Sequence, residues 1–129
     1  MPPDGRESQR PPPRAFVIED DLPTLRLLSE LVASVGLEPV PFTRITPARR
    51  AMRERRPAVL LVDDDLPDGR GAELVRELRA DPRMRNVKVL FCTAADPARQ
   101  REIARLAPVI AKPFRLRDME RALAEVASA

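Results

Sequence analysis

The chain of 129 residues has no histidine, tryptophan or tyrosine, and it has only one cysteine. A single cysteine, Cys92, excludes an internal disulfide bond and suits a reducing compartment. No apolar run approaches the length of a membrane span, and the N-terminus lacks the apolar core of a signal peptide. Because aromatic residues make up only 3% of the chain, Leu, Val, Ile and Ala must fill the core. These absences predict a soluble, cytoplasmic protein without a membrane partner.

The composition is that of an ordinary globular domain, with 43% apolar and 33% charged residues. The length favours one domain and is sufficient for a full core. A net charge of only +3 gives no sign of a nucleic-acid partner. Residues 1–14 are rich in Pro and Arg and cannot bury enough apolar surface to fold, so we predict a disordered tail. The folded domain is expected to span residues 15–129.

The most unusual stretch is an apolar run, residues 59–62, that leads directly into three aspartates, residues 63–65. The apolar run predicts a buried parallel strand, and Pro67 with Asp68-Gly69 predicts a turn. Adjacent carboxylates at the end of a buried strand raise one another's pKa and oppose packing. We therefore expect a cation beside them.

Segments with strand and helix patterns alternate five times along the chain. This alternation predicts an α/β fold, a doubly wound five-stranded parallel sheet of the flavodoxin-like type with strand order 2-1-3-4-5. Pro39 and Pro41 place the second strand at the edge of the sheet. The predicted strands cover residues 15–18, 37–42, 59–62, 87–92 and 109–111. The predicted helices cover residues 23–35, 47–56, 71–80, 96–106 and 115–126, and the apolar face of the last one contains Leu116, Met119, Leu123 and Val126.

Polar side chains stand where four of these strands end. Glu19 and Asp20 follow the first strand, Asp63 the third, Thr93 the fourth and Lys112 the fifth. Ligands of such sheets bind outside the carboxyl ends of the strands, so these residues should converge. Clustered carboxylates suit Mg²⁺, and a carboxylate beside Mg²⁺ can attack a phosphoryl group to form an aspartyl phosphate. A hydroxyl and an ammonium group would stabilise the phosphoryl oxygens. Each residue alone has an ordinary structural explanation, but the combination favours this function.

The chain resembles the receiver domain of two-component response regulators over residues 15–127. The resemblance rests on four motifs in a fixed order: Val-Ile-Glu-Asp-Asp, Leu-Val-Asp-Asp-Asp-Leu-Pro-Asp-Gly, Cys-Thr-Ala and Ala-Lys-Pro-Phe. In this family the phosphoacceptor lies four residues before the Pro of the turn. Pro67 therefore selects Asp63 as the acceptor.

The resemblance also implies the roles of the other site residues. Glu19 and Asp20 correspond to the acid pair that binds Mg²⁺, together with Asp63 and the backbone carbonyl of Asp65. Thr93 corresponds to the switch hydroxyl and Lys112 to the phosphate-binding lysine.

Further implications concern positions beside the site. The Lys112–Pro113 peptide bond is expected to be cis. Asp65 and Ala95 occupy the positions that tune the lifetime of the phosphoryl group, and Asp64 is expected to be a bystander turned away from the site. Val109 stands where the family usually has an aromatic residue that moves with the switch hydroxyl. We therefore predict a muted or rerouted change at the face formed by the fourth helix, fifth strand and fifth helix.

The resemblance implies a single-domain response regulator in two-component or phosphorelay signalling. Its partners would be a histidine kinase or histidine phosphotransfer protein and a downstream protein target, and the domain itself would be a monomer or weak homodimer. It would not be an enzyme beyond catalysing its own phosphorylation and dephosphorylation. The alternatives are a receiver excised from a hybrid histidine kinase or a transcription factor, and, remotely, a phosphatase with an aspartyl nucleophile. The phosphatase leaves the acids after the first strand unexplained, and a receiver unable to accept phosphate is disfavoured because every required residue is present.

Overall fold

The computed structural model describes residues 11–129. Most of the predicted tail, residues 1–10, lies outside the described residues. The first strand, β1 (Arg14–Ile18), begins one residue before the predicted strand. The carbonyl oxygen of Pro13 accepts a hydrogen bond from the backbone N–H of Glu38 at 2.8 Å, so the sheet already pairs at this point.

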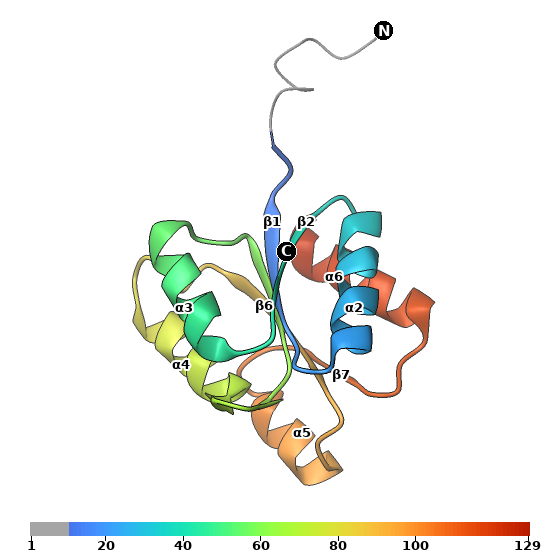
Figure 1. The fold of residues 1–129 in the computed structure, drawn as a ribbon. Helices are drawn as coiled ribbons and strands as arrows, with labels where there is room; N and C mark the ends of the chain where they lie inside the picture. The colour runs from blue at the N-terminus through green and yellow to red at the C-terminus, as the bar shows by residue number, and fades with distance from the viewer. Residues whose placement is uncertain (1–10) are drawn as a thin grey trace, which may run out of the picture.

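A five-stranded parallel sheet forms the centre of the molecule (Figure 1). Its strands are β1, β2 (Glu38–Phe42), β3 (Val59–Val62), β6 (Lys88–Thr93) and β7 (Val109–Ala111). Their order is β2-β1-β3-β6-β7, which confirms the predicted order 2-1-3-4-5. The strand β2 lies at the edge as expected. The backbone N–H of Glu38 points towards β1, so the backbone nitrogens of Pro39 and Pro41 point to the opposite, open side of the strand. No strand of the described residues pairs there, so the missing N–H groups of the prolines cost no hydrogen bond.

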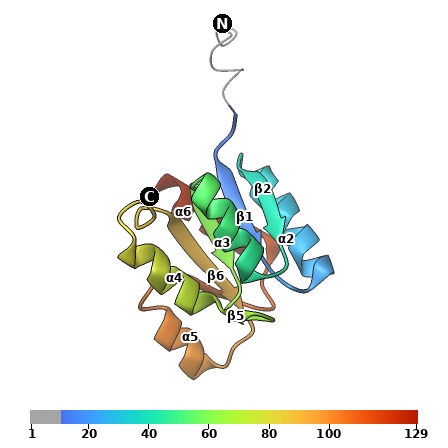
Figure 2. The same ribbon diagram turned by 60° about the vertical axis from the view of Figure 1, so that its left-hand side comes forward.

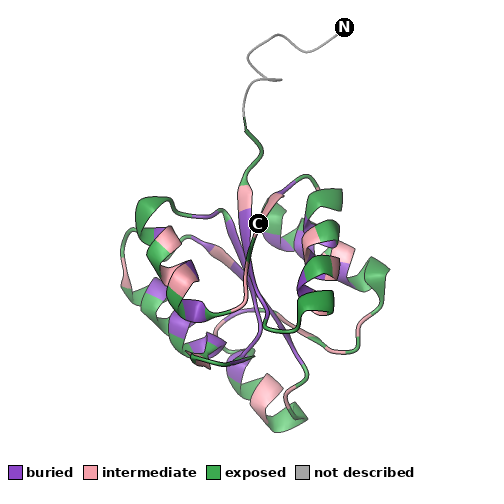
Figure 3. Cartoon of the chain, in the orientation of Figure 1, coloured by how far each residue is buried: buried purple, intermediate pink, exposed green. Residues whose placement is uncertain are grey.

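Helices cover both faces of the sheet (Figures 1 and 2). One face carries α2 (Leu22–Ser34) and α6 (Leu116–Ser128), and the other carries α3 (Ile45–Glu54), α4 (Gly71–Ala80) and α5 (Pro97–Ile103). Alternate strand residues supply the two cores: Phe16 and Ile18 pack towards α3, α4 and α5, whereas Ala15 and Val17 pack towards α2 and α6. The strands β1, β3 and β6 are buried almost throughout, whereas the outer strands β2 and β7 are only partly buried, and many exposed residues lie on the outer sides of the helices (Figure 3).

Particular residues fix three of the helix ends. Asp21 caps α2, because its carboxylate accepts the N–H of Thr24 at 3.1 Å. Gly36 follows the end of α2 with a φ of +88°, a conformation that favours glycine. In the same way Asp96 caps α5 by accepting the N–H of Arg99 at 2.8 Å.

Three helix predictions were wrong in part. The helix predicted over residues 96–106 ends at Ile103. The helix predicted over residues 47–56 begins two residues earlier, because the Asp68 carboxylate accepts the N–H groups of Ile45 and Thr46, both at 2.8 Å. This cap comes from 23 residues away in the chain, so no local motif announces it. Leu116 was placed on the buried face of the last helix, but it starts α6 and is 51% exposed.

Within residues 11–129, no helix combines the length and the apolar character needed to cross a bilayer.

Candidate functional site

The polar residues predicted to converge do so at the carboxyl ends of the strands. Ile18 is in register with Val62, so the residues that follow β1 lie beside those that follow β3. The backbone N–H of Asp63 donates to the carbonyl oxygen of Ile18 at 3.1 Å, which extends this pairing into the site. On the other side β6 pairs with β7 and aligns Thr93 with Ala111, the residue before Lys112.

Three carboxylates form the acidic cluster of the site, from Glu19, Asp20 and Asp63. One oxygen from each lies within 4.8 Å of the others. Glu19 and Asp63 are buried, with 1% and 8% exposure, whereas Asp20 is exposed. Three hard oxygen donors, two of them held inside the protein, fit a divalent cation such as Mg²⁺, which prefers a few carboxylates together with water and phosphate oxygens.

Lys112 neutralises part of this cluster. Its Nζ lies 2.9 Å from Oδ2 of Asp63 and also contacts Oε1 of Glu19. Burial disfavours the charged ammonium, but the two carboxylates outweigh burial and raise the pKa of Lys112 well above its ordinary 10.5. The Lys112–Pro113 peptide bond is cis, as the resemblance implies. The cation expected beside the three consecutive aspartates is therefore present.

Thr93 ends β6 with its side chain buried at the same edge of the sheet. Its Oγ1 accepts the N–H of Ala95 at 3.2 Å, and the carbonyl oxygen of Ala95 accepts the side-chain amide of Gln100 in α5 at 2.7 Å. The loop that carries Thr93 is thus attached to the first turn of α5. Val109 pairs with Phe91 in the sheet and packs partly buried against the core under α3, α4 and α5.

A short hairpin follows Asp63 and shapes the cavity wall. It consists of β4 (Asp65–Leu66) and β5 (Gly69–Arg70), with the predicted turn between them. The N–H of Asp65 donates to Oδ1 of Asp63 at 3.3 Å, while the Asp65 side chain is 84% exposed. At the base of the hairpin a Cβ atom on Gly71 would lie 2.2 Å from the carbonyl oxygen of Asp63, so only glycine fits there.

The prediction that Asp64 is a bystander was wrong. Its carboxylate does point away from the acidic cluster, but it is fully buried and forms a two-pronged ion pair with Arg99 of α5, at 2.8 and 3.1 Å. It also accepts the N–H of Ala72 at 3.0 Å at the start of α4. Burial alone would raise the pKa of Asp64, but the hydrogen bonds from Arg99 and Ala72 outweigh it and lower that pKa below 3.8. Asp64 therefore joins β3, α4 and α5 immediately beside Asp63.

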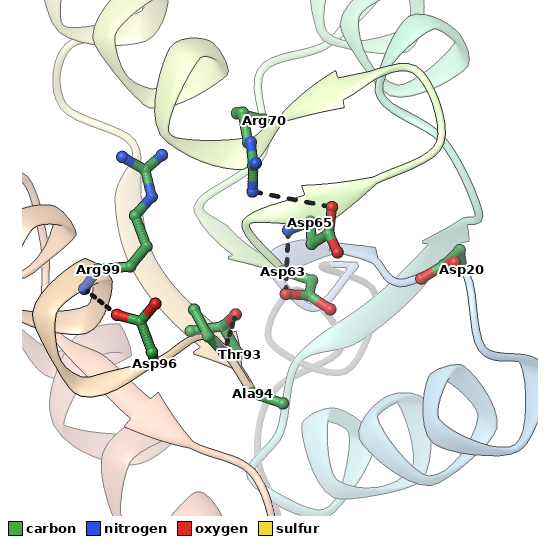
Figure 4. Close-up of a pocket in the computed structure, with 9 residues that line it drawn as sticks. Asp20, Asp63, Asp65, Arg70, Thr93, Ala94, Asp96 and Arg99 are labelled. Carbon is green, nitrogen blue, oxygen red and sulfur yellow. Dashed lines mark hydrogen bonds and ion pairs between the residues drawn. The ribbon is translucent and has the colours of Figure 1, made fainter.

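A cavity of about 480 Å³ opens above Asp63 (Figure 4). Its walls come from the ends of β1, β3 and β6, the hairpin, and the start of α5. The lining residues are Asp20, Asp63, Asp65, Arg70, Thr93, Ala94, Ala95, Asp96 and Arg99. Figure 4 shows Arg70 on the hairpin side of the cavity, across from Thr93, with Asp63 between them. The sequence alone predicts no role for Arg70 or Arg99.

An open parallel sheet with buried carboxylates, a lysine and a threonine at its switch point has the fold and the polar groups of a signalling receiver. Comparison with known families confirms this class, because residues 15–124 match the family described as response regulator receiver domain. The chain belongs to this family. It is a receiver domain of two-component signal transduction rather than a conventional enzyme.

Relatives and solved structures agree with this assignment. The chain is 29% identical over 83 residues to the polar-differentiation response regulator DivK of Brucella anthropi, covering 64% of this chain and 68% of the relative. DivK of Brucella ovis is 28% identical over 79 residues, covering 61% and 64%. The chain thus spans about two thirds of the length of these curated relatives.

Three solved structures share the fold. A sensor protein from Polaromonas sp. JS666 has a TM-score of 0.81 at 27% identity, covering 92% of this chain and 98% of that chain. A putative response regulator from Chloroflexus aurantiacus has a TM-score of 0.84 at 20% identity, covering 92% and 100%. The chemotaxis response regulator CheY4 of Vibrio cholerae has a TM-score of 0.79 at 18% identity, covering 90% and 99%.

Proposed function

We propose that the domain accepts a phosphoryl group on Asp63 and signals through protein–protein interactions that depend on this phosphorylation. The observation that carries the proposal is the placement of the Asp63 carboxylate, which is buried between two other acids and lies 2.9 Å from the Lys112 ammonium. The donor would be a phosphohistidine on a histidine kinase or a histidine phosphotransfer protein. A response regulator implies a kinase partner, and the phosphohistidine is the specific form we propose.

In the proposed reaction an oxygen of the Asp63 carboxylate attacks the phosphorus of the donor. The P–N bond breaks, its electron pair returns to the imidazole, and the imidazole takes a proton from solvent. Lys112 leaves its contact with Asp63 for a phosphoryl oxygen, and the Thr93 hydroxyl donates to another. Glu19, Asp20, Asp63 and the backbone carbonyl of Asp65 would hold Mg²⁺. That ion would offset the negative charge of the phosphoryl oxygens.

Hydrolysis of the aspartyl phosphate would be tuned from the cavity mouth. The exposed Asp65 side chain and the methyl group of Ala95 both line the cavity through which water reaches Asp63. Comparing the decay of the phosphorylated wild type with that of Asp65→Asn measures the contribution of the Asp65 charge.

The output is proposed to bypass the usual aromatic residue, since position 109 holds a valine. Chemical shifts with and without beryllofluoride should change little at the face formed by α5, β7 and α6 compared with the residues around Asp63. A large rearrangement at that face would contradict the proposal.

The direct test is labelling with Mg²⁺ and phosphoramidate, followed by intact-protein mass spectrometry. The wild type should gain one phosphoryl group and Asp63→Asn none. Asp65→Asn serves as the matched control, because it removes a neighbouring charge and keeps the backbone carbonyl, so it should still be labelled. Equal labelling of the wild type and Asp63→Asn would refute the proposal.

Whether the chain acts as a stand-alone regulator is a separate part of the proposal. Single-domain action is supported by the similarity to DivK, a response regulator. Size-exclusion chromatography of the native protein from its own cells would distinguish this from a receiver within a hybrid kinase or a transcription factor.

A further inference from the structure

The cavity above Asp63 is lined by more negative than positive side chains. Its acids are Asp20, Asp63, Asp65 and Asp96, and its bases are two arginines. A phosphoryl donor is itself an anion, so the carboxylates at this mouth would repel it. The availability of a positive group at the mouth therefore affects how well the donor can enter.

Two of the positive groups near Asp63 are already engaged. Lys112 contacts Glu19 and Asp63 beneath the cavity. Arg99 is held by the buried Asp64 carboxylate, and its remaining nitrogen lies 3.2 Å from Glu102. Moving Arg99 towards an incoming anion would leave Asp64 buried without its partner, which is costly.

Among the residues 11–129 that the structure describes, Arg70 is the cavity-lining cation that remains available. Its NH1 lies 3.8 Å from Asp64 and 3.8 Å from Asp65, distances too long for hydrogen bonds. Its side chain is 53% exposed, and that of Asp65 is 84% exposed, so solvent weakens this pair. Asp64 is already satisfied by Arg99 and by the N–H of Ala72 and does not require Arg70. An anion in the cavity can therefore attract the Arg70 guanidinium with little loss elsewhere.

We propose that Arg70 is a phosphoryl-binding residue of this site, which holds the oxygens of the incoming donor and then those of the phosphoryl group on Asp63. This role rests on the proposed function of Asp63. The planar guanidinium can offer two parallel N–H donors to two phosphoryl oxygens, a geometry that Lys112 cannot provide. In Figure 4 Arg70 extends from β5 towards Asp65 and Asp63 from the hairpin side of the cavity. Arg70 transfers no proton, because a guanidinium stays charged throughout, and the bond changes remain those at Asp63 and the donor nitrogen.

The experiment measures the second-order rate constant for labelling of the full chain by phosphoramidate with Mg²⁺. Arg70→Ala should lower this constant about fivefold to tenfold, the effect of losing one charge-assisted contact at a partly solvated site. Arg70→Lys should recover part of the rate, because the charge returns without the planar fork. Arg76→Ala is the matched control: it removes an exposed arginine of α4 that does not line the cavity, and it should label like the wild type.

Salt dependence separates binding from a structural effect. The rate advantage of the wild type over Arg70→Ala should shrink as sodium chloride is raised, because salt screens the attraction between the Arg70 charge and the anionic donor. Identical rates and salt slopes in Arg70→Ala and the wild type would overturn the role of Arg70 and leave the proposed function of Asp63 intact.

A second measurement does not depend on covalent labelling. Titration with inorganic phosphate in the presence of Mg²⁺ should shift the Arg70 Nε–H resonance in an NMR spectrum and leave that of Arg76 unchanged. If the wild type were not labelled at all, the proposed function would fail, and this titration would still decide whether Arg70 binds phosphoryl oxygens. An unshifted Arg70 resonance would reject the inference.

Discussion

Replacing Arg99 with leucine tests the buried ion pair most directly. The substitution places an apolar side chain near the start of α5 and leaves the Asp64 carboxylate, which is fully buried, without its bidentate partner. One hydrogen bond, from the N–H of Ala72, would remain. The free energy of unfolding should therefore fall, even though Arg99 lies outside the proposed reaction.

The magnitude follows from the burial of the two partners. Removing one member of a buried ion pair costs about 3–5 kcal/mol. Because the Arg99 side chain is 23% exposed, solvent reaches one side of the pair, and we expect the lower end, about 3 kcal/mol. For a domain of this size that loss lowers the Tm by about 10 °C.

The loss should also depend on pH. In the wild type the pKa of Asp64 is lowered below its ordinary 3.8. The stability that Asp64 contributes is therefore present above about pH 4 and is lost as the pH falls through the lowered pKa of the folded state. Without Arg99, burial raises the pKa of Asp64, and the carboxyl takes up a proton in the folded state before the unfolded chain does. The difference in stability between wild type and variant should therefore shrink from pH 7 towards pH 4.

Urea unfolding at several pH values measures these quantities. The double variant Asp64→Asn/Arg99→Leu removes the charge and keeps the acceptor for Ala72, so it should lose only about 1 kcal/mol. Arg49→Leu is the matched surface control, because Arg49 pairs with Glu77 at 2.9 Å with both side chains partly exposed, and it should cost less than about 1 kcal/mol. A double variant as unstable as Arg99→Leu, or a loss unchanged by pH, would refute the reasoning.

Three further measurements test other contacts. Gly71→Ala should lower the free energy of unfolding by about 3 kcal/mol and slow labelling, because its Cβ would press on the carbonyl oxygen of Asp63. The control Gly36→Ala has open space around its Cβ but a positive φ, so it should lower the free energy of unfolding by only about 1 kcal/mol and leave labelling unchanged. Asp68→Ala should cost about 1 kcal/mol at neutral pH, and because the pKa of Asp68 is lowered to about 2, this difference should disappear as pH falls from about 4 to 2; a constant difference would contradict the capping role. Burial raises the pKa of the Cys92 thiol to about 12, so iodoacetamide at pH 8 should modify it only as urea unfolds the chain; rapid reaction with the native protein would show that this core opens.

The sheet and the location of the acidic cluster were predictable because their signals are local. Apolar runs of four or more residues announce strands such as β3, and the polar residues that follow each run lie at strand ends whatever the details of packing. The Asp64–Arg99 pair had no such signal, since its members are 35 residues apart and meet only once α5 has packed beside β3. The early start of α3 had the same cause, because the carboxylate that caps it belongs to the turn of the hairpin.

The unequal burial of the Asp64–Arg99 pair also constrains its evolutionary history. Arg99 retains 23% of its side-chain exposure and a contact to Glu102, whereas the Asp64 side chain has no exposure. A lineage that first exchanged Asp64 for asparagine would leave an arginine that still reaches water and another acid. A lineage that first exchanged Arg99 would leave the buried Asp64 carboxylate without its ion-pair partner. Descendants lacking this pair should therefore have changed position 64 before position 99, and chains with an aspartate at 64 but no base at 99 should be rare.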